Sequence, residues 1–167
     1  GYIFFFMSSV WETLLWQTWW CVDGSLSNGW SHGLSFQKAS DNAYTFSSTS
    51  LHTDTRQGES STEIYSGSAT FETEEKLILA AKHFTSYGED PEQPEEEKDI
   101  KDVFYLQIKH QKNSMALVGK IGDVDGVWTS TDPYQDPEAD LTARKISKAD
   151  PKVAVGSNAI VSGRKKS

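Results

Sequence analysis

The sequence predicts an all-β protein: an antiparallel barrel or sandwich of about seven to nine strands with a short N-terminal α-helix. From Leu34 onward, apolar residues alternate with polar ones in runs that are separated by turn-forming residues. The connections between these runs are short and contain no long helical pattern, which favours antiparallel pairing over alternating β-α units. A chain of 167 residues, 37% of them hydrophobic, is long enough for one domain with its own core.

The N-terminal region is apolar and rich in tryptophan. Residues 2–22 contain fifteen apolar residues, one carboxylate (Glu12) and no lysine or arginine. Ser9 and Glu12 fit a capping box, helical spacing follows, and Asp23-Gly24 is a stop signal, so we expect a helix over about residues 10–21. Such a helix would reach about 18 Å, which is too short for a bilayer core of about 30 Å.

A membrane span is therefore a second choice, and no signal peptide is expected, because there is no basic n-region or small-residue cleavage site. Docking on protein is the preferred reading, either across the mouth of this chain's own barrel or in a groove of a partner. Contact with a membrane surface stays open. The expected docking residues are Phe4, Phe5, Phe6, Trp11, Trp16, Trp19 and Trp20.

The strands follow in order after Gly24. Tyr44 and Phe46 share one face of an early strand, and Phe104, Leu106 and Ile108 point inward on a later one. Tight turns are expected in "KASDNA", "TEE", "QKNS" and "GDVDG". The expected strands lie within residues 34–36, 43–51, 65–71, 76–85, 103–110, 115–121 and 127–129.

Charge divides the chain into three regions: the N-terminal tail and helix (1–23), a β domain (24–147) and a basic tail (148–167). Residues 1–140 carry 9 Lys/Arg and 23 Asp/Glu, whereas residues 141–167 carry seven basic residues and one acid. The acidic body would repel a phosphate backbone, so nucleic-acid binding is not expected. Residues 88–102 are expected to form a mobile acidic loop within the β domain.

No motif commits the chain to catalysis, a metal or a nucleotide. Gly29-Trp30-Ser31-His32-Gly33 matches the nucleophile-elbow pattern and resembles serine hydrolases of the α/β-hydrolase family. That elbow needs a strand before it and a helix after it, and turn formers precede this one, so we expect a glycine-rich turn. His83 and His110 lie on strands that we expect to be neighbours, and Asp123-x-Asp125-Gly126 is read as a β-turn. The single cysteine, Cys21, excludes an internal disulfide, so this is not a disulfide-dependent secreted protein.

Trp30, placed after a short helix and before about eight strands, resembles the lipocalin or wider calycin group. In that family a Gly-x-Trp motif closes one end of the barrel, and a late arginine packs over the indole. Here the order is Asn28-Gly29-Trp30, so the glycine directly precedes the tryptophan and the motif is shifted by one residue. The late arginine is Arg144 or Arg164. The resemblance covers residues 24–147 and implies a cup that holds a hydrophobic small molecule or pigment. The implied lining residues are Trp30, Tyr44, Phe46, Tyr65, Phe71, Phe84, Phe104, Leu106, Met115 and Trp128.

The leading functional hypothesis is a non-enzymatic binding protein for such a molecule, with the apolar N-terminal helix used for docking. No cofactor is identified. Three alternatives stay open: an accessory subunit of a larger, membrane-bound assembly; an enzyme, either a serine hydrolase at Ser31 or a lyase built in the barrel; and a carbohydrate-binding sandwich. A solid core filled by the same aromatic residues is an equally simple reading of the strand faces.

Overall fold

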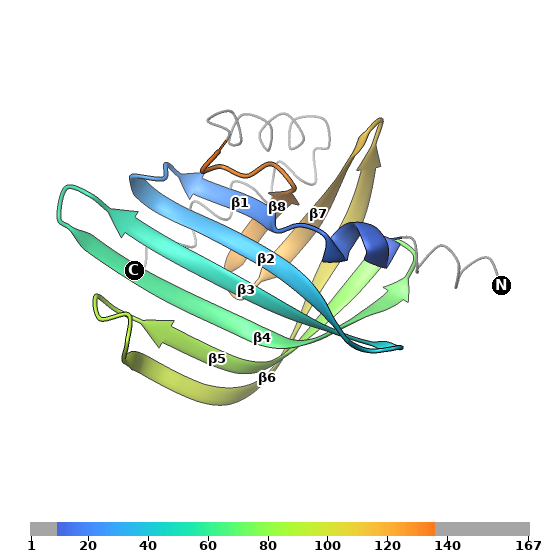
Figure 1. Ribbon diagram of the computed structural model, residues 1–167, viewed down its shortest axis with the longest axis horizontal. Coiled ribbons are helices and arrows are strands. Elements are labelled where there is room, and N and C mark those ends of the chain that lie inside the picture. Colours follow the sequence, from blue (N-terminus) through green and yellow to red (C-terminus); the bar gives the residue numbers. More distant parts are fainter. Residues whose placement is uncertain (1–9, 136–167) are drawn as a thin grey trace.

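The computed structural model describes residues 10–135, which form a closed antiparallel barrel of eight strands (Figure 1). Each strand pairs with its neighbours in sequence, and β8 returns to β1. The predicted all-β fold is confirmed, and the sheet is a barrel rather than a sandwich. The strands are β1 (Trp19–Gly24), β2 (Asn28–Ser40), β3 (Ala43–Asp54), β4 (Glu59–Thr73), β5 (Lys76–Tyr87), β6 (Pro94–Gln111), β7 (Ser114–Ile121) and β8 (Val124–Thr129).

The loops alternate between two ends of the barrel. The helix covers the end formed by the β2–β3, β4–β5 and β6–β7 turns, which we call the helix end; we call the opposite end the far end. The predicted tight turns are present: the last pairs of their hairpins are Ser40–Ala43, Thr73–Lys76, Gln111–Ser114 and Ile121–Val124.

The predicted N-terminal helix is shorter than its apolar sequence suggested. Helical structure covers residues 10–15, and Trp19 already begins β1. Burial along β1 alternates, with Trp19, Cys21 and Asp23 buried and the residues between them half-buried. This period of two is that of a strand with one face toward a core, so pairing with β2 overrides the helical spacing of the tryptophans.

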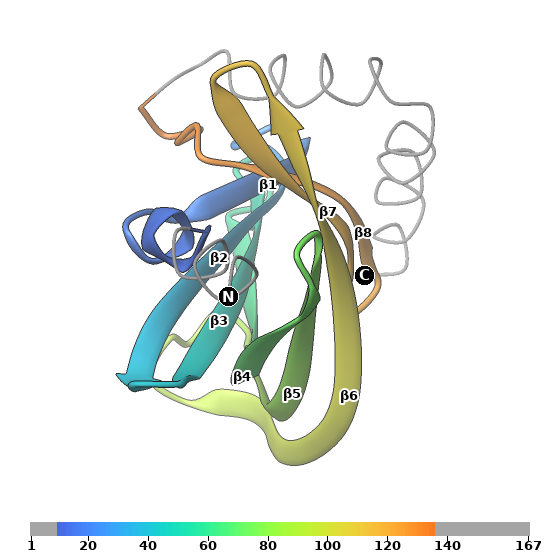
Figure 2. The ribbon, with the colours of Figure 1, turned by 90° about the vertical axis from the view of Figure 1, so that its right-hand side faces the viewer.

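The helix closes the barrel with an indole. Trp11 is buried and stacks on Tyr44 of β3, with ring centroids 3.9 Å apart. Its ring also meets the edges of Phe36 and Phe71, at 5.8 and 5.0 Å. The end-on view of Figure 2 shows the helix beside the β2–β3 side of the barrel. Of the two docking modes predicted for Trp11, the structure shows contact with this chain's own barrel.

The register gives the barrel a wide interior. The cross-strand partners of Trp20, followed through β2, β3, β4 and β5, lead to Glu97 of β6. Followed in the other direction, through β8 and β7, they lead to Lys109 of the same strand, which is twelve residues further along. For eight strands, this stagger implies a tilt of about 45° and a backbone radius of about 9 Å. A barrel of this size either fills with side chains or holds one small ligand.

The acidic segment 88–102, predicted to be a loop, is mostly strand. β6 begins at Pro94, and Glu96 and Glu97 pair with Ser86 and Thr85 of β5. Backbone pairing does not require the carboxylates to be buried, so their charge does not prevent the strand. Among the described residues, β7 pairs with β6 only from Leu106 onward, and the acidic part of β6 is therefore a sheet edge. Charged side chains and Pro94 suit such an edge because they oppose pairing with other chains.

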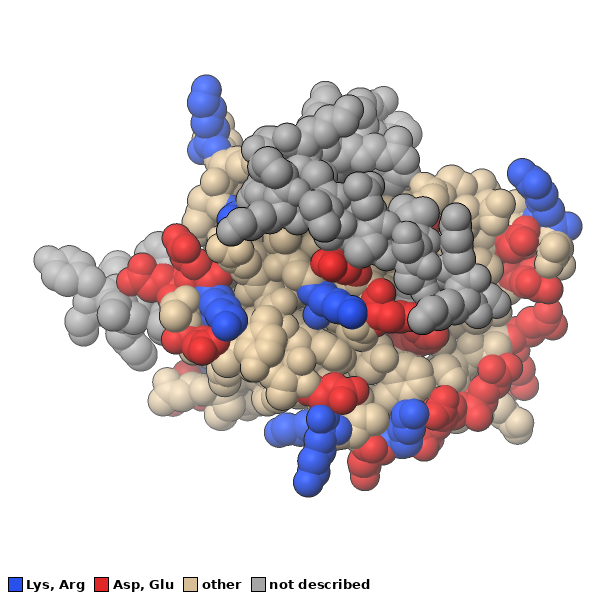
Figure 3. All heavy atoms as spheres, turned by 180° about the vertical axis from the view of Figure 1, so that it is seen from behind, with Lys and Arg blue, Asp and Glu red and all other residues tan. Residues whose placement is uncertain are grey.

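Seven carboxylates lie between residues 89 and 99, at the β5–β6 hairpin. Figure 3 shows acidic side chains along the side of the molecule that carries this hairpin.

Several predicted features lie outside the described residues: Phe4, Phe5, Phe6, the Ser9 cap, Arg144, Arg164 and the basic tail. Across residues 10–135, no helix has the length and apolarity needed to cross a bilayer.

Replacing Trp11 by alanine should lower the free energy of unfolding by about 3–5 kcal/mol, because it removes a buried indole and leaves a cavity at the helix end. Urea unfolding followed by circular dichroism measures this change. Trp16→Ala is the matched control: Trp16 is 86% exposed, so its removal should change stability by less than about 0.5 kcal/mol. Equal effects of the two substitutions would contradict the described packing.

Candidate functional site

The two halves of the barrel interior differ in chemistry. Toward the helix end, the inward side chains are fully buried aliphatic residues, including Leu34, Leu77, Leu79, Leu106 and Leu117. Toward the far end, the inner wall carries aromatic, imidazole and hydroxyl groups, and several of them are only half-buried. The far half is therefore the more polar and the less completely buried part of the interior.

Trp30 of β2 lies between two histidines on the inner wall of the far half. Its indole is parallel to the His32 ring, with centroids 6.0 Å apart, and lies 4.9 Å from the His52 ring on β3. Cross-strand pairing of Trp30 with His52 and of His32 with Ser50 brings these side chains to one face. His32 is buried, and its Nδ1 is hydrogen-bonded to Ser50 Oγ at 2.7 Å.

A second aromatic group, from β4, β5 and β6, lies on the same inner wall. Tyr65 contacts Phe84 and Phe104, with ring centroids 4.9 and 5.3 Å apart. Tyr65 and Phe84 are half-buried, so part of each ring is accessible to solvent. The Lys98 ammonium lies 5.5 Å from the centre of the Phe84 ring and 2.8 Å from Glu96, which gives this wall a charged rim.

The β7–β8 turn touches this aromatic wall. Gly122 has φ +63°, and a Cβ placed on it would lie 3.0 Å from the Tyr65 ring. Tyr65 of β4 therefore reaches across to the turn between β7 and β8. This contact narrows the far half between two walls that are distant in the sequence.

Trp128 of β8 places a polar atom in the apolar part of the interior. Its indole is fully buried, and among residues 10–135 its Nε1–H has no hydrogen-bond acceptor. The indole of Trp19 is also buried, but its Nε1–H donates to the Leu14 carbonyl at 3.4 Å. A buried donor without an acceptor destabilises the fold by about 1–3 kcal/mol.

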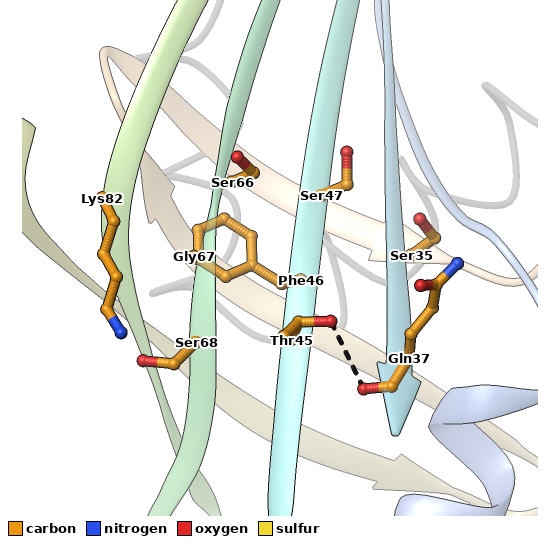
Figure 4. Close-up of a pocket in the computed structure, with 9 residues that line it drawn as sticks. All are labelled: Ser35, Gln37, Thr45, Phe46, Ser47, Ser66, Gly67, Ser68 and Lys82. Atoms are coloured by element: carbon orange, nitrogen blue, oxygen red, sulfur yellow. Dashed lines mark hydrogen bonds between the residues drawn. The ribbon is translucent and has the colours of Figure 1, made fainter. Parts of the chain in front are cut away.

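A separate cavity of about 430 Å³ lies on the outer face of the sheet, over β2–β5 (Figure 4). Gly67 is required there, because a side chain would strike the Ala80 carbonyl at a register shift between β4 and β5. The lining residues are Ser35, Gln37, Thr45, Phe46, Ser47, Ser66, Gly67, Ser68 and Lys82.

The ten residues predicted to line the interior fall into three groups. Trp30, Tyr65, Phe84 and Phe104 come together in the far half, together with His32 and His52. Tyr44 and Phe71 surround Trp11 at the helix end, where Met115 also lies. The others, deep in the core, are Phe46, Leu106 and Trp128.

The residues predicted for partner docking also separate. Trp11 and Trp19 are buried in this chain's own core, and Trp20 is half-buried with its ring 5.6 Å from that of Tyr134. Trp16 is exposed beside the helix.

The nucleophile-elbow pattern lies inside a strand, so the predicted glycine-rich turn around Ser31 is wrong. Residues 29–33 belong to β2 and pair with β1 on one side and β3 on the other. Trp30, His32 and Leu34 point inward in the alternation of a strand. Ser31 faces outward, and its hydroxyl is 2.8 Å from that of Tyr134. This setting lacks the strand-turn-helix geometry that exposes a catalytic serine.

The other titratable residues predicted as site candidates do not lie close to one another in the structure. β5 and β6 are neighbours, as expected, but His83 pairs with Asp99, 2.6 Å from Nδ1 to Oδ1, whereas His110 lies near the helix end. The Asp123 segment forms the expected turn, and burial raises the pKa of Asp125 above its ordinary value, partly opposed by Lys120. Within residues 10–135, no three histidine, cysteine or acidic side chains form a group that could hold a metal.

Sequence reasoning missed His32 and His52 as partners of Trp30. The available signal was the period-two series Trp30, His32, Leu34, Phe36, which indicates a strand rather than a turn.

Comparison of the chain with protein-family models, curated proteins and solved structures finds no match in any of the three.

Gly122→Ala should destabilise the protein more than Gly58→Ala, although both glycines have positive φ (+63° and +67°). Both substitutions carry backbone strain of about 1 kcal/mol, but only the Cβ at Gly122 meets a ring; around Gly58 there is open space. Thermal unfolding of both variants measures the difference. If Gly58→Ala proves at least as harmful, the contact between Tyr65 and the β7–β8 turn is refuted.

Trp128→Phe should change the free energy of unfolding by less than about 1 kcal/mol, because the lost packing is offset by removal of an unpaired donor. Trp19→Phe removes the same atoms from an equally buried site but also breaks the bond to Leu14, so it should cost about 1–2 kcal/mol more. Urea titrations of the two variants give this comparison. A larger loss for Trp128→Phe would mean that its N–H already has an acceptor in solution.

Proposed function

We propose that this protein is a non-enzymatic binding protein that holds a hydrophobic small molecule or pigment in the far half of its barrel, as its resemblance to lipocalins implies. The observation that carries the proposal is the half-buried aromatic wall of Tyr65 and Phe84, backed by Phe104. Aromatic rings with unburied surface on a concave wall are typical of small-molecule sites.

Two further features support this function. The twelve-residue stagger gives the barrel a radius at which eight-stranded barrels hold a ligand. The His32–Ser50 pair and the Lys98 ammonium then offer polar groups to fix the orientation of a molecule that is otherwise apolar. A ligand with one acceptor group, such as a carboxylate or a carbonyl, fits this combination.

The test is binding of all-trans-retinol and of the fluorescent fatty acid cis-parinarate to the purified chain, followed by quenching of tryptophan emission. Phe84→Ala should weaken binding about tenfold, because one aromatic contact contributes about 1.5–3 kcal/mol. Tyr105→Ala is the matched control, since Tyr105 lies on the outer face of β6 and is 51% exposed. Absence of binding to the folded protein, or equal loss in both variants, would refute the proposal.

A second candidate function, docking on a larger assembly, is favoured by one observation. Trp16 is 86% exposed. A cavity of about 580 Å³ lies between the helix and the β6–β7 turn, lined in part by Thr13, Gln17 and Asn113. Exposed tryptophans are frequent anchors of protein interfaces. Co-purification from the native source with wild-type and Trp16→Ala chains tests this: loss of a partner in the variant alone would support docking.

A further inference from the structure

Hydroxyl side chains are the most frequent polar groups around the cavity on the outer face of β2–β5. Five side chains on three adjacent strands contribute them: Ser35, Thr45, Ser47, Ser66 and Ser68. Thr45 Oγ1 donates to the Gln37 carbonyl at 3.5 Å, but within residues 10–135 the four serine hydroxyls make no side-chain hydrogen bond. All four are half-buried and gathered around one hollow, as Figure 4 shows. Four hydroxyls are thus free to exchange hydrogen bonds with one ligand.

The charge in this cavity is opposite to that of the protein. Lys82 is the one charged lining residue, and it forms no ion pair with any residue in the described range 10–135. It occupies the register shift between Ala81 and His83, at the rim of the hollow. None of the carboxylates within residues 10–135 lines the cavity, although the whole chain carries a net charge of −8. The local environment therefore accepts one negative charge that most of this surface would repel.

These groups specify the chemistry of a ligand. Serine hydroxyls both donate and accept, so they match a molecule that itself carries several hydroxyl groups. The Cβ atoms of the serines supply apolar contact between the polar groups, as the C–H faces of a sugar ring require. The ammonium adds a preference for an anionic substituent, and the cavity volume of about 430 Å³ is within the range of small-molecule sites.

We propose that this outer cavity binds an acidic sugar: its ring hydroxyls contact the serines of β2, β3 and β4, and its anionic group pairs with Lys82. The anionic group is either a carboxylate, as in a sugar acid, or a phosphate ester. This site is on the opposite face of the sheet from the barrel interior, so it stands independently of the proposed hydrophobic ligand.

The experiment is a titration of the ¹⁵N-labelled full chain with D-glucuronate, glucose 6-phosphate, neutral D-glucose and inorganic phosphate. The two acidic sugars should shift the amide signals of residues 35–37, 45–47, 66–68 and 82. The sugar that binds more tightly shows whether the site prefers a carboxylate or a phosphate ester. Neutral glucose and inorganic phosphate, each of which satisfies only half of the site, should bind at least about fivefold more weakly.

Two variants test the roles of the residues. Lys82→Gln should remove the preference for acidic over neutral sugar, and Ser66→Ala should weaken both; neither change affects a buried group, so the fold is kept. Lys112→Gln is the matched control, because it makes the same charge change at the exposed β6–β7 turn. The proposal is overturned if 50 mM acidic sugar shifts none of these amides. It is overturned equally if inorganic phosphate alone binds as well, or if Lys112→Gln weakens binding as much as Lys82→Gln.

Discussion

Closure of the sheet between β1 and β8 is the constraint on which the rest of this structure depends. The closing contact is short, with Trp20 opposite Thr129. With this contact in place, the registers of the other seven strand pairs together give the barrel a stagger of twelve residues. The stagger sets the strand tilt and the barrel radius. The inner faces of eight strands then converge on one space, and residues from distant parts of the sequence become neighbours.

The same constraint explains why a helix is needed at one end. A barrel of this radius is too wide for aliphatic side chains alone to seal its mouth. Trp11 seals it by stacking on Tyr44 and meeting Phe36 and Phe71, so the apolar N-terminal sequence is used within the chain. At the far end, Tyr65 narrows the interior by reaching the β7–β8 turn. There the inner wall carries half-buried aromatic rings, so the two halves of the barrel differ in packing and in chemistry.

The outer surface is also divided, and the division follows the strands. Carboxylates are concentrated on the β5–β6 hairpin, where β6 lies at a sheet edge and charge opposes pairing with other chains. The outer face of β2–β4 carries serine and threonine instead, and a register shift beside Gly67 hollows it. The acidic edge is therefore separate from the outer face that carries hydroxyl groups and Lys82.

The sequence by itself determined the fold class, most strands and their inner faces, because alternation of apolar residues and the turns at Asp41-Asn42 and Lys112-Asn113 are local signals. It also identified Trp30, Tyr65, Phe84 and Phe104 as residues of the interior. Only the tertiary structure decided that Trp19–Gly24 is a strand and that Pro94 begins one, since in both segments pairing with a neighbour outweighs local preference. It alone placed His32 and His52 around Trp30 and joined serines of three strands to Lys82. Such neighbours are set by cross-strand register, a long-range property that no short stretch of sequence contains.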